Sequence, residues 1–156
     1  MNRKISIVIP TFNRAKYLTT AIDSCLNQTV PCEIIVCDHG STDNTADVVK
    51  NYGDRITYIR REKDFGPHYM WLDGILHATN DWIHLNYDDD WIEPTFIEKC
   101  EKLITEETAF IATDVIIYNE ESNLNTHHIC MLNNKPTGLY NSKYFFLSKL
   151  LFFWIK

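Results

Sequence analysis

Residues 84–91 read His84-Leu85-Asn86-Tyr87-Asp88-Asp89-Asp90-Trp91, and they continue an apolar run that begins at Trp82. The apolar run predicts a buried strand, and open α/β sheets bind their ligands at the carboxyl ends of such strands. Three adjacent carboxylates repel one another unless a positive charge lies among them. The stretch is therefore either a divalent-cation site with coordination positions left for phosphate oxygens or a solvated acidic turn.

The composition is typical of one soluble globular domain. The chain has 156 residues, of which 45% are hydrophobic and 23% are charged, enough for one compact domain and too few for two ordinary ones. Its formal net charge of −6 argues against a general nucleic-acid-binding surface. The five cysteines form no Cys-x-x-Cys pair, which favours reduced thiols in a cytoplasmic protein over a disulfide framework.

The apolar runs at the two ends of the chain predict neither a signal peptide nor a membrane span. The run at 5–9 is too short for a signal and ends at Pro10. Residues 144–155 are very apolar but fall short of the roughly 20 residues that a spanning helix needs. We expect this tail to pack on the domain, on a second copy of the chain, or at a membrane surface. The protein would then be cytoplasmic, either free or peripheral to the inner face of the membrane.

Strand and helix patterns alternate four times along the chain. Buried strands are expected at 5–9, 34–37, 56–59 and 82–87, and apolar residues at helical spacing predict helices at 18–26, 46–52, 72–76 and 94–104. A fifth strand is expected at 109–118, and a weaker strand pattern lies near 128–132. The alternation predicts an α/β fold, with a mostly parallel, Rossmann-like sheet flanked by helices on both faces.

Three polar segments follow three of the predicted strands, at 11–14, 38–43 and 88–90. The carboxyl ends of parallel strands share one edge of the sheet, so the three segments should lie together there. Their convergence favours a ligand site over a simple acidic turn.

Four motifs in this order resemble those of the family 2 glycosyltransferases, which have the GT-A fold. They are Ile7-Val8-Ile9-Pro10-Thr11-Phe12-Asn13-Arg14, Leu26-Asn27-Gln28-Thr29, Ile35-Val36-Cys37-Asp38-His39-Gly40-Ser41-Thr42-Asp43 and Tyr87-Asp88-Asp89-Asp90-Trp91-Ile92-Glu93-Pro94. The resemblance covers residues 4–118. It implies transfer of a sugar from a nucleotide diphosphate to an acceptor, with inversion at the anomeric carbon, and an Asp-x-Asp motif that holds Mn²⁺ or Mg²⁺ on the diphosphate.

The resemblance also implies which residues contact the nucleotide. These are Thr11, Asn13, Asp38, His39 and Asp88. His39 stands where the family usually has a second acidic residue that often contacts the base. Imidazole can donate or accept a hydrogen bond, so a base contact is still expected. A UDP-sugar is the expected donor.

The metal ligands implied by the resemblance are Asp89, as the principal one, and Asp88. Tyr87 occupies the other end of the usual Asp-x-Asp, so Asp88 is the expected second carboxylate. Arg61 or Lys63 would supply positive charge to the diphosphate.

The resemblance divides the chain into a donor-binding domain, residues 1–118, and a partial acceptor-side region with the apolar tail, residues 119–156. No residue matches the family's catalytic base. The acceptor would be a glycan or a lipid-linked glycan, and the pathway polysaccharide or glycan biosynthesis. We expect donor binding without efficient transfer.

Two other functions remain open from the sequence. A phosphotransferase of the haloacid dehalogenase type also places Asp-x-Asp after a strand, but it needs a nucleophilic Asp where this chain has Thr11-Phe12-Asn13. A non-catalytic or truncated nucleotide-sugar-binding module is favoured by His39, by Tyr87 and by the missing base.

Overall fold

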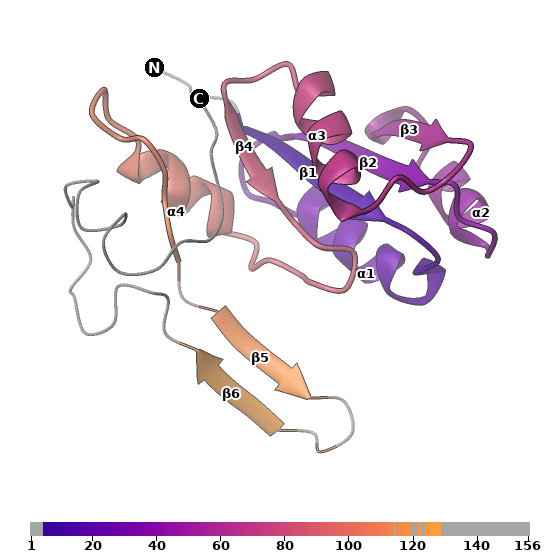
Figure 1. Cartoon of the computed structure of the whole chain (residues 1–156). Helices are drawn as coiled ribbons and strands as arrows, with labels where there is room; N and C mark the ends of the chain where they lie inside the picture. The colour runs from indigo at the N-terminus through magenta and orange to yellow at the C-terminus, as the bar shows by residue number, and fades with distance from the viewer. Residues whose placement is uncertain (1–4, 114, 120–121, 123, 129–156) are drawn as a thin grey trace. The chain divides into compact units, whose positions relative to one another are not determined.

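The computed structural model describes residues 5–113, 115–119, 122 and 124–128 (Figure 1). The chain divides into two compact units, residues 1–102 and 103–156. The first unit contains β1 (Ile5–Thr11), α1 (Ala15–Leu26), β2 (Glu33–His39), α2 (Thr45–Lys50), the 3-10 helix η1 (Gly53–Arg55), β3 (Thr57–Arg61), α3 (Pro67–His77), β4 (Trp82–Leu85) and all but the last residue of α4 (Phe96–Leu103). The second unit contains β5 (Val115–Asn119) and β6 (Leu124–His128).

The first unit is built on a four-stranded sheet in the order β3-β2-β1-β4, with every neighbouring pair parallel. The chain runs outward from β1 through β2 to β3, and it then crosses back to place β4 on the other side of β1. The direction of winding therefore reverses between β1 and β4. In open α/β sheets, such a reversal leaves a crevice outside the carboxyl ends of the two strands.

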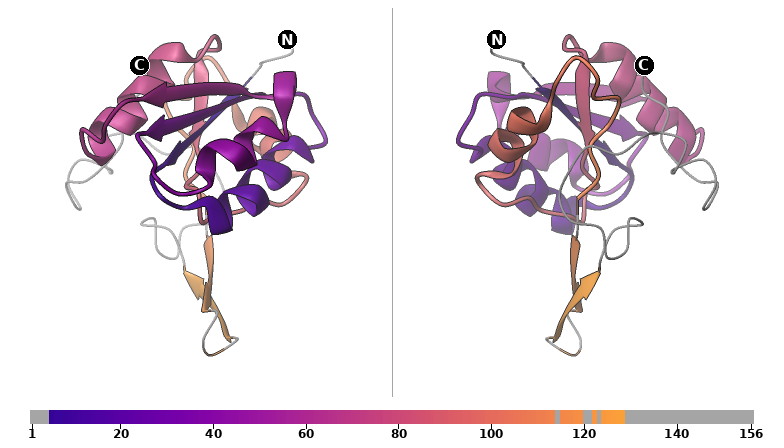
Figure 2. Two further views of the ribbon diagram at one scale, coloured as in Figure 1. Left: turned by 90° about the vertical axis from the view of Figure 1, so that its right-hand side faces the viewer. Right: turned by 90° about the vertical axis from the view of Figure 1, so that its left-hand side faces the viewer.

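Helices cover both faces of this sheet, as the sequence predicts. α3 packs against β1 and β2 on one face, and α1, with α2 beside it, lies on the other face (Figure 2). All seven residues of β1 are buried, and Ile7, Val8 and Ile9 have no exposed surface. The continuous apolar runs of the strands follow from this double cover, because neither face of a parallel sheet is left to water.

α3 lies unusually close to the sheet at Gly74. A Cβ atom added there would overlap the Cγ1 of Val8 and come within 3.0 Å of the Cys37 Sγ. Leu72 and Leu76, two of the apolar residues that predict this helix, are instead exposed. Their spacing correctly predicts a helix. The face of this helix that packs on the sheet is, however, the one that carries Gly74.

The second unit differs from the sequence prediction. The expected fifth strand at 109–118 begins only at Val115, and β5 pairs antiparallel with β6 in a separate two-stranded sheet. Four residues separate β5 from β6, too few for the crossover that parallel neighbours need, so the pair forms a hairpin. β6 ends at His128; the rest of the weaker strand pattern, like the apolar tail at 144–155, lies outside the described residues.

Within the described residues, no helix combines the length and the apolar character that crossing a bilayer requires.

The close approach at Gly74 makes a prediction about stability. Gly74→Ala should lower the free energy of unfolding by about 1–3 kcal/mol, because overpacking against β1 outweighs the better helix propensity of alanine. Leu76→Ala, on the exposed side of the same helix, is the control and should change it by less than about 0.5 kcal/mol. Urea unfolding of both variants would test this, and equal stabilities would show that α3 does not pack on the sheet at Gly74.

Candidate functional site

A pocket of about 200 Å³ lies where the winding of the sheet reverses, at the ends of β1 and β4. The end of β1, the residue before α1, the start of α3 and the acidic turn after β4 all contribute to it. The lining residues are Pro10, Thr11, Phe12, Arg14, Pro67, Met70, Trp71, Tyr87 and Asp88. Two of the three predicted polar segments, 11–14 and 88–90, thus line the pocket, and two predicted site residues, Thr11 and Asp88, border the same cavity. The third segment begins at Asp38, which is in register with Thr11 at the same edge of the sheet.

Asn86, which is not among the site residues predicted from the sequence, fixes the conformation of the acidic turn after β4. The backbone N–H of Asn86 donates to the Val8 carbonyl at 2.9 Å, which extends the pairing of β1 and β4. Its side-chain Nδ2 donates to the carbonyls of Tyr87 at 2.9 Å and of Asp90 at 3.2 Å. Asn86 is 2% exposed, so these bonds satisfy a buried amide and also fix the turn that carries the carboxylates.

The carboxylates of the turn are crowded and partly withdrawn from water. Burial raises the pKa of Asp88, and the charge of Asp89 raises it further, while the Thr11 hydroxyl and the Arg14 guanidinium act in the opposite direction. Burial and the charge of Asp89 likewise raise the pKa of Asp90. Both neighbours of Asp89 are therefore ionised at an energetic cost, which a bound cation would reduce.

Arg14 is the basic residue of this pocket. Its Nη1 donates to the Oδ2 of Asp89 at 3.0 Å, and the two side chains are 48% and 45% exposed. Of the described residues that line the pocket, Arg14 is the only one with a positive side chain. Arg14 lies within the first of the four sequence motifs, but the resemblance did not imply a contact between this residue and the diphosphate.

Arg61 and Lys63, which the sequence analysis did suggest for the diphosphate, have other partners. Arg61 makes a bidentate ion pair with Asp73 on α3, with N···O distances of 2.7 and 2.9 Å, and this pairing holds the pKa of Asp73 below its usual value. The Lys63 Nζ lies 5.0 Å from the ring centre of Phe65. Neither is among the described residues that line the pocket, so their proposed contact with the diphosphate stays a prediction.

His39 is 1% exposed, and its Nε2 lies 3.1 Å from the Oδ2 of Asp73. Its other ring nitrogen, Nδ1, is buried without a hydrogen-bond partner among the described residues. A buried polar atom without a partner is uncommon in proteins and calls for a reason. The predicted contact between His39 and a base would provide one, and it stays a prediction.

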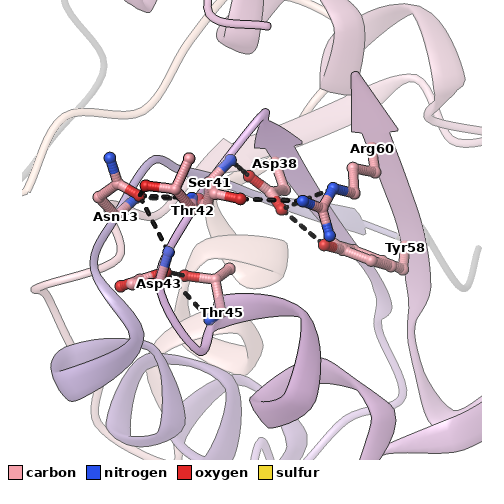
Figure 3. Close-up of polar contacts among 8 residues, drawn as sticks. All are labelled: Asn13, Asp38, Ser41, Thr42, Asp43, Thr45, Tyr58 and Arg60. Carbon is pink, nitrogen blue, oxygen red and sulfur yellow. Dashed lines mark hydrogen bonds and ion pairs between the residues drawn. The ribbon is translucent and has the colours of Figure 1, made fainter. Parts of the chain in front are cut away.

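Asn13 holds the loop after β1 against the loop after β2 (Figure 3). Its Oδ1 accepts hydrogen bonds from the backbone N–H of Thr42 at 2.7 Å and of Asp43 at 3.4 Å, and its own N–H donates to the Ser41 Oγ at 2.9 Å. We call these four residues the loop clamp. Asn13 has a φ of 56°, a left-handed conformation that asparagine tolerates better than most residues. The loop clamp fixes the backbone beside the pocket.

Asp43 extends the loop clamp to the first turns of two helices. Its Oδ2 accepts from the backbone N–H of Ala15, the first residue of α1, at 3.0 Å. Its Oδ1 accepts from the N–H of Thr45, the first residue of α2, at 3.0 Å and from the Thr45 hydroxyl at 2.6 Å. One carboxylate thereby joins the starts of α1 and α2.

Asp38 is fully buried and has protein partners for both oxygens (Figure 3). Its Oδ1 accepts from the Ser41 N–H at 2.8 Å, and its Oδ2 accepts from the Tyr58 hydroxyl at 2.6 Å, with the Arg60 Nε at 3.7 Å. Burial and the contact with Asp38 raise the pKa of Tyr58, which keeps the phenol a donor. In the structure Asp38 positions the loop after β2, and its predicted contact with a nucleotide is untested.

The donor set fits a divalent cation that shares its coordination with phosphate. Among the described residues, no group of three or more His, Cys, Asp or Glu side chains could hold a metal ion by itself. Mg²⁺ sites that bind phosphate typically use only one or two carboxylates from the protein. Asp88 and Asp89 provide that number at the edge of the pocket, and their mutual repulsion favours a cation there.

Comparison with known proteins identifies the family. The model of the family described as "Glycosyl transferase family 2" matches residues 6–154. The chain belongs to glycosyltransferase family 2. This membership agrees with the resemblance and removes the support for the phosphotransferase alternative.

A curated glycosyltransferase and solved structures are similar over most of the chain. Glycosyltransferase GlyA of Streptococcus pneumoniae is 31% identical over 131 residues, which are 81% of this chain and 19% of GlyA. The structure of S. aureus TarS 1–349 in complex with UDP is 25% identical with a TM-score of 0.61, over 64% of this chain and 31% of that one. TarS 1–349 has also been solved with UDP-GlcNAc.

A third structure carries both a nucleotide and a metal ion. It is glucosyl-3-phosphoglycerate synthase from Mycobacterium tuberculosis in complex with Mn²⁺, UDP and glucosyl-3-phosphoglycerate, at 23% identity and a TM-score of 0.52, over 62% of this chain and 38% of that one. At this identity the likeness shows the fold alone. The chain thus spans between 19% and 38% of the length of these three proteins.

The loop clamp makes a prediction about the backbone beside the pocket. Asn13→Gly should lower the free energy of unfolding by about 1 kcal/mol, because the side-chain bonds are lost while glycine tolerates the positive φ. Asn13→Ala loses the same bonds and should cost about 1–2 kcal/mol more, because alanine disfavours the left-handed region. Thermal and urea unfolding would rank the variants, and an alanine variant as stable as the glycine variant would contradict this conformation of Asn13.

Proposed function

We propose that the chain is the donor-binding part of an enzyme that transfers a sugar from a nucleoside-diphosphate sugar to an acceptor with the help of a divalent cation. The observation that carries the proposal is the pocket at the ends of β1 and β4, with Asp88 in its lining and Asp89 paired to Arg14, which also lines it. Membership of family 2 supports the reaction class. The complexes of TarS with UDP and UDP-GlcNAc support a nucleotide sugar as the ligand.

Asp88 and Asp89 would hold the cation through their carboxylate oxygens. A divalent cation bound there would act as a Lewis acid toward the diphosphate, which accumulates negative charge as it leaves. The turn fixed by Asn86 would keep the backbone that carries both carboxylates in place when the cation binds. Mn²⁺ and Mg²⁺ are the expected ions, and the Mn²⁺ complex of the synthase from M. tuberculosis is consistent with either.

Thr11 and the loop clamp would bind the nucleotide side of the donor. Thr11 lines the pocket at the end of β1, and the clamp sets the backbone conformation immediately after it. His39 and Asp38 follow on the neighbouring strand, where Asp38 is in register with Thr11. We propose UDP as the nucleotide, since the TarS structures that resemble this chain bind UDP and UDP-GlcNAc.

The family resemblance, and not the pocket, supports the proposals about the acceptor and the stereochemistry. We propose that the transfer inverts the configuration at the anomeric carbon. We propose a glycan or lipid-linked acceptor, with the donor site in residues 1–118 and acceptor contacts in 119–156. Within the described residues we assign no base.

A nucleotide-sugar-binding module without transferase activity is the second candidate. Tyr87 favours it, because the phenol stands where the family usually has a carboxylate, and its pKa is raised by burial and by Asp90 and Asp89. A neutral phenol is a weaker metal ligand than a carboxylate. Product analysis with a UDP-sugar donor would separate the two candidates, since only the enzyme releases free or transferred sugar.

Asp89→Asn tests the cation site. The variant should keep its fold and lose at least about tenfold in UDP affinity in the presence of Mn²⁺, because a charged ligand of the cation is replaced by a neutral amide. Isothermal titration calorimetry with and without Mn²⁺ would measure this. Asp47→Asn is the matched control, since Asp47 is an exposed carboxylate that pairs with Lys50 on α2. Equal UDP affinity in the Asp89 variant and the control would place the cation elsewhere.

A further inference from the structure

Arg14 lies where both the proposed cation and the proposed donor would bind. Its Nη1 bonds to the Oδ2 of Asp89, an oxygen that a cation at this carboxylate would coordinate. Its charge also acts on Asp88, where it offsets part of the rise in pKa that burial causes. At the same time Arg14 lines the pocket. One guanidinium therefore contacts a proposed metal ligand, Asp89, and lines the space proposed for the donor.

A divalent cation and this guanidinium cannot share Asp89 without strong repulsion. Two positive groups on one carboxylate oppose each other, and at short range their repulsion is large even in a partly solvated site. The ion pair that must be broken is a weak one, because both side chains are about half exposed and exposed pairs contribute little. A cation that takes Asp89 would therefore displace Arg14.

The backbone of Arg14 is fixed by the start of α1, while its half-exposed side chain has room to rotate away from Asp89. Its carbonyl accepts from the N–H groups of Tyr17 at 3.0 Å and Leu18 at 3.2 Å, in the first turn of α1. The guanidinium carbon lies 5.8 Å from the ring centre of Tyr17, at the outside of the protein. Rotation of the side chain would thus leave the helix start unchanged.

A phosphate group in the pocket would be a better partner for the displaced guanidinium than water. Guanidinium presents a planar set of donors that matches two phosphate oxygens, which favours Arg over Lys wherever phosphate is bound in this way. We infer that Arg14 exchanges partners: it pairs with Asp89 in the free protein, and it binds the diphosphate once a divalent cation occupies Asp89. This inference rests on the proposed function.

The exchange couples the two ligands through one side chain. A cation that binds alone must break the ion pair and gains nothing from the released Arg14. A cation that binds together with a diphosphate regains that interaction, so each ligand should strengthen the binding of the other by the same factor. Arg14 would then oppose the binding of the metal alone and promote the binding of the metal with UDP.

Replacing Arg14 should therefore shift two affinities in opposite directions. In Arg14→Ala, Mn²⁺ alone should bind about two- to fivefold more tightly, the scale of an exposed ion pair. UDP at saturating Mn²⁺ should bind about tenfold more weakly, the scale of a lost charge-assisted hydrogen bond. Electron paramagnetic resonance of free Mn²⁺ would measure the first affinity and calorimetry the second.

Three further variants keep the result interpretable. Arg14→Lys retains the charge without the planar donors and should recover part of the UDP affinity. Lys50→Ala, which removes an exposed ion pair on α2, should change neither affinity. Arg14→Gln offers the same two comparisons if the alanine variant is unstable.

The opposite shifts would support the exchange. Unchanged Mn²⁺ affinity, or a loss of both affinities together, would overturn it while leaving the proposed function intact, provided that the unaltered chain binds UDP with Mn²⁺. If the unaltered chain binds neither ligand, the proposed function fails and the exchange fails with it.

Discussion

Parallel hydrogen bonding between β1 and both of its neighbours determines where the site can lie. Thr11 at the end of β1 is in register with Asp38 on β2, and on the other side the pairing of Val8 with Leu85 brings the turn after β4 to the same edge. β1 can take this central place because each of its residues is buried between two helical layers. The closeness of α3 at Gly74 completes that cover. A change in the register of β1 would therefore separate the carboxylates from the pocket.

The loops at this edge are held by side chains of the chain itself. Asn86 fixes the acidic turn, Asn13 joins the loops after β1 and β2, and Asp38 anchors the second loop through Ser41 and Tyr58. Each of these side chains has a polar partner, and Asn86 and Asp38 are buried, so the hydrogen bonds specify one loop conformation. The carboxylates of the acidic turn are the exception, because they are crowded and Asp89 is paired with a half-exposed Arg14. A site built in this way is rigid in its backbone and electrostatically unsatisfied at the position proposed for the cation.

The sequence predicted the parallel sheet and the strand-end edge because buried strands and amphipathic helices leave a periodic signal. It could not predict contacts between residues distant in the sequence. Arg61 has the charge expected of a phosphate contact, but its bidentate pairing with Asp73 depends on how α3 lies on the sheet. Arg14 belongs to one of the sequence motifs, but its contact with Asp89 is seen only in the structure. Asn86 carries no signal of its own, since an amide after a strand is as typical of an ordinary turn. The antiparallel pairing of β5 was missed because strand periodicity does not encode strand direction.

Paramagnetic broadening by Mn²⁺ tests the central claim most directly, since it locates the cation without assuming any ligand. Backbone amide signals of the chain would be followed by NMR as substoichiometric Mn²⁺ is added in the presence of UDP. We predict the strongest broadening at Asp88 and Asp89, followed by Thr11 and Arg14, and much weaker broadening along α2. The same titration without UDP should give weaker broadening at these four residues. Strongest broadening at any other part of the sheet edge would contradict the assignment of the acidic turn as the metal and diphosphate site.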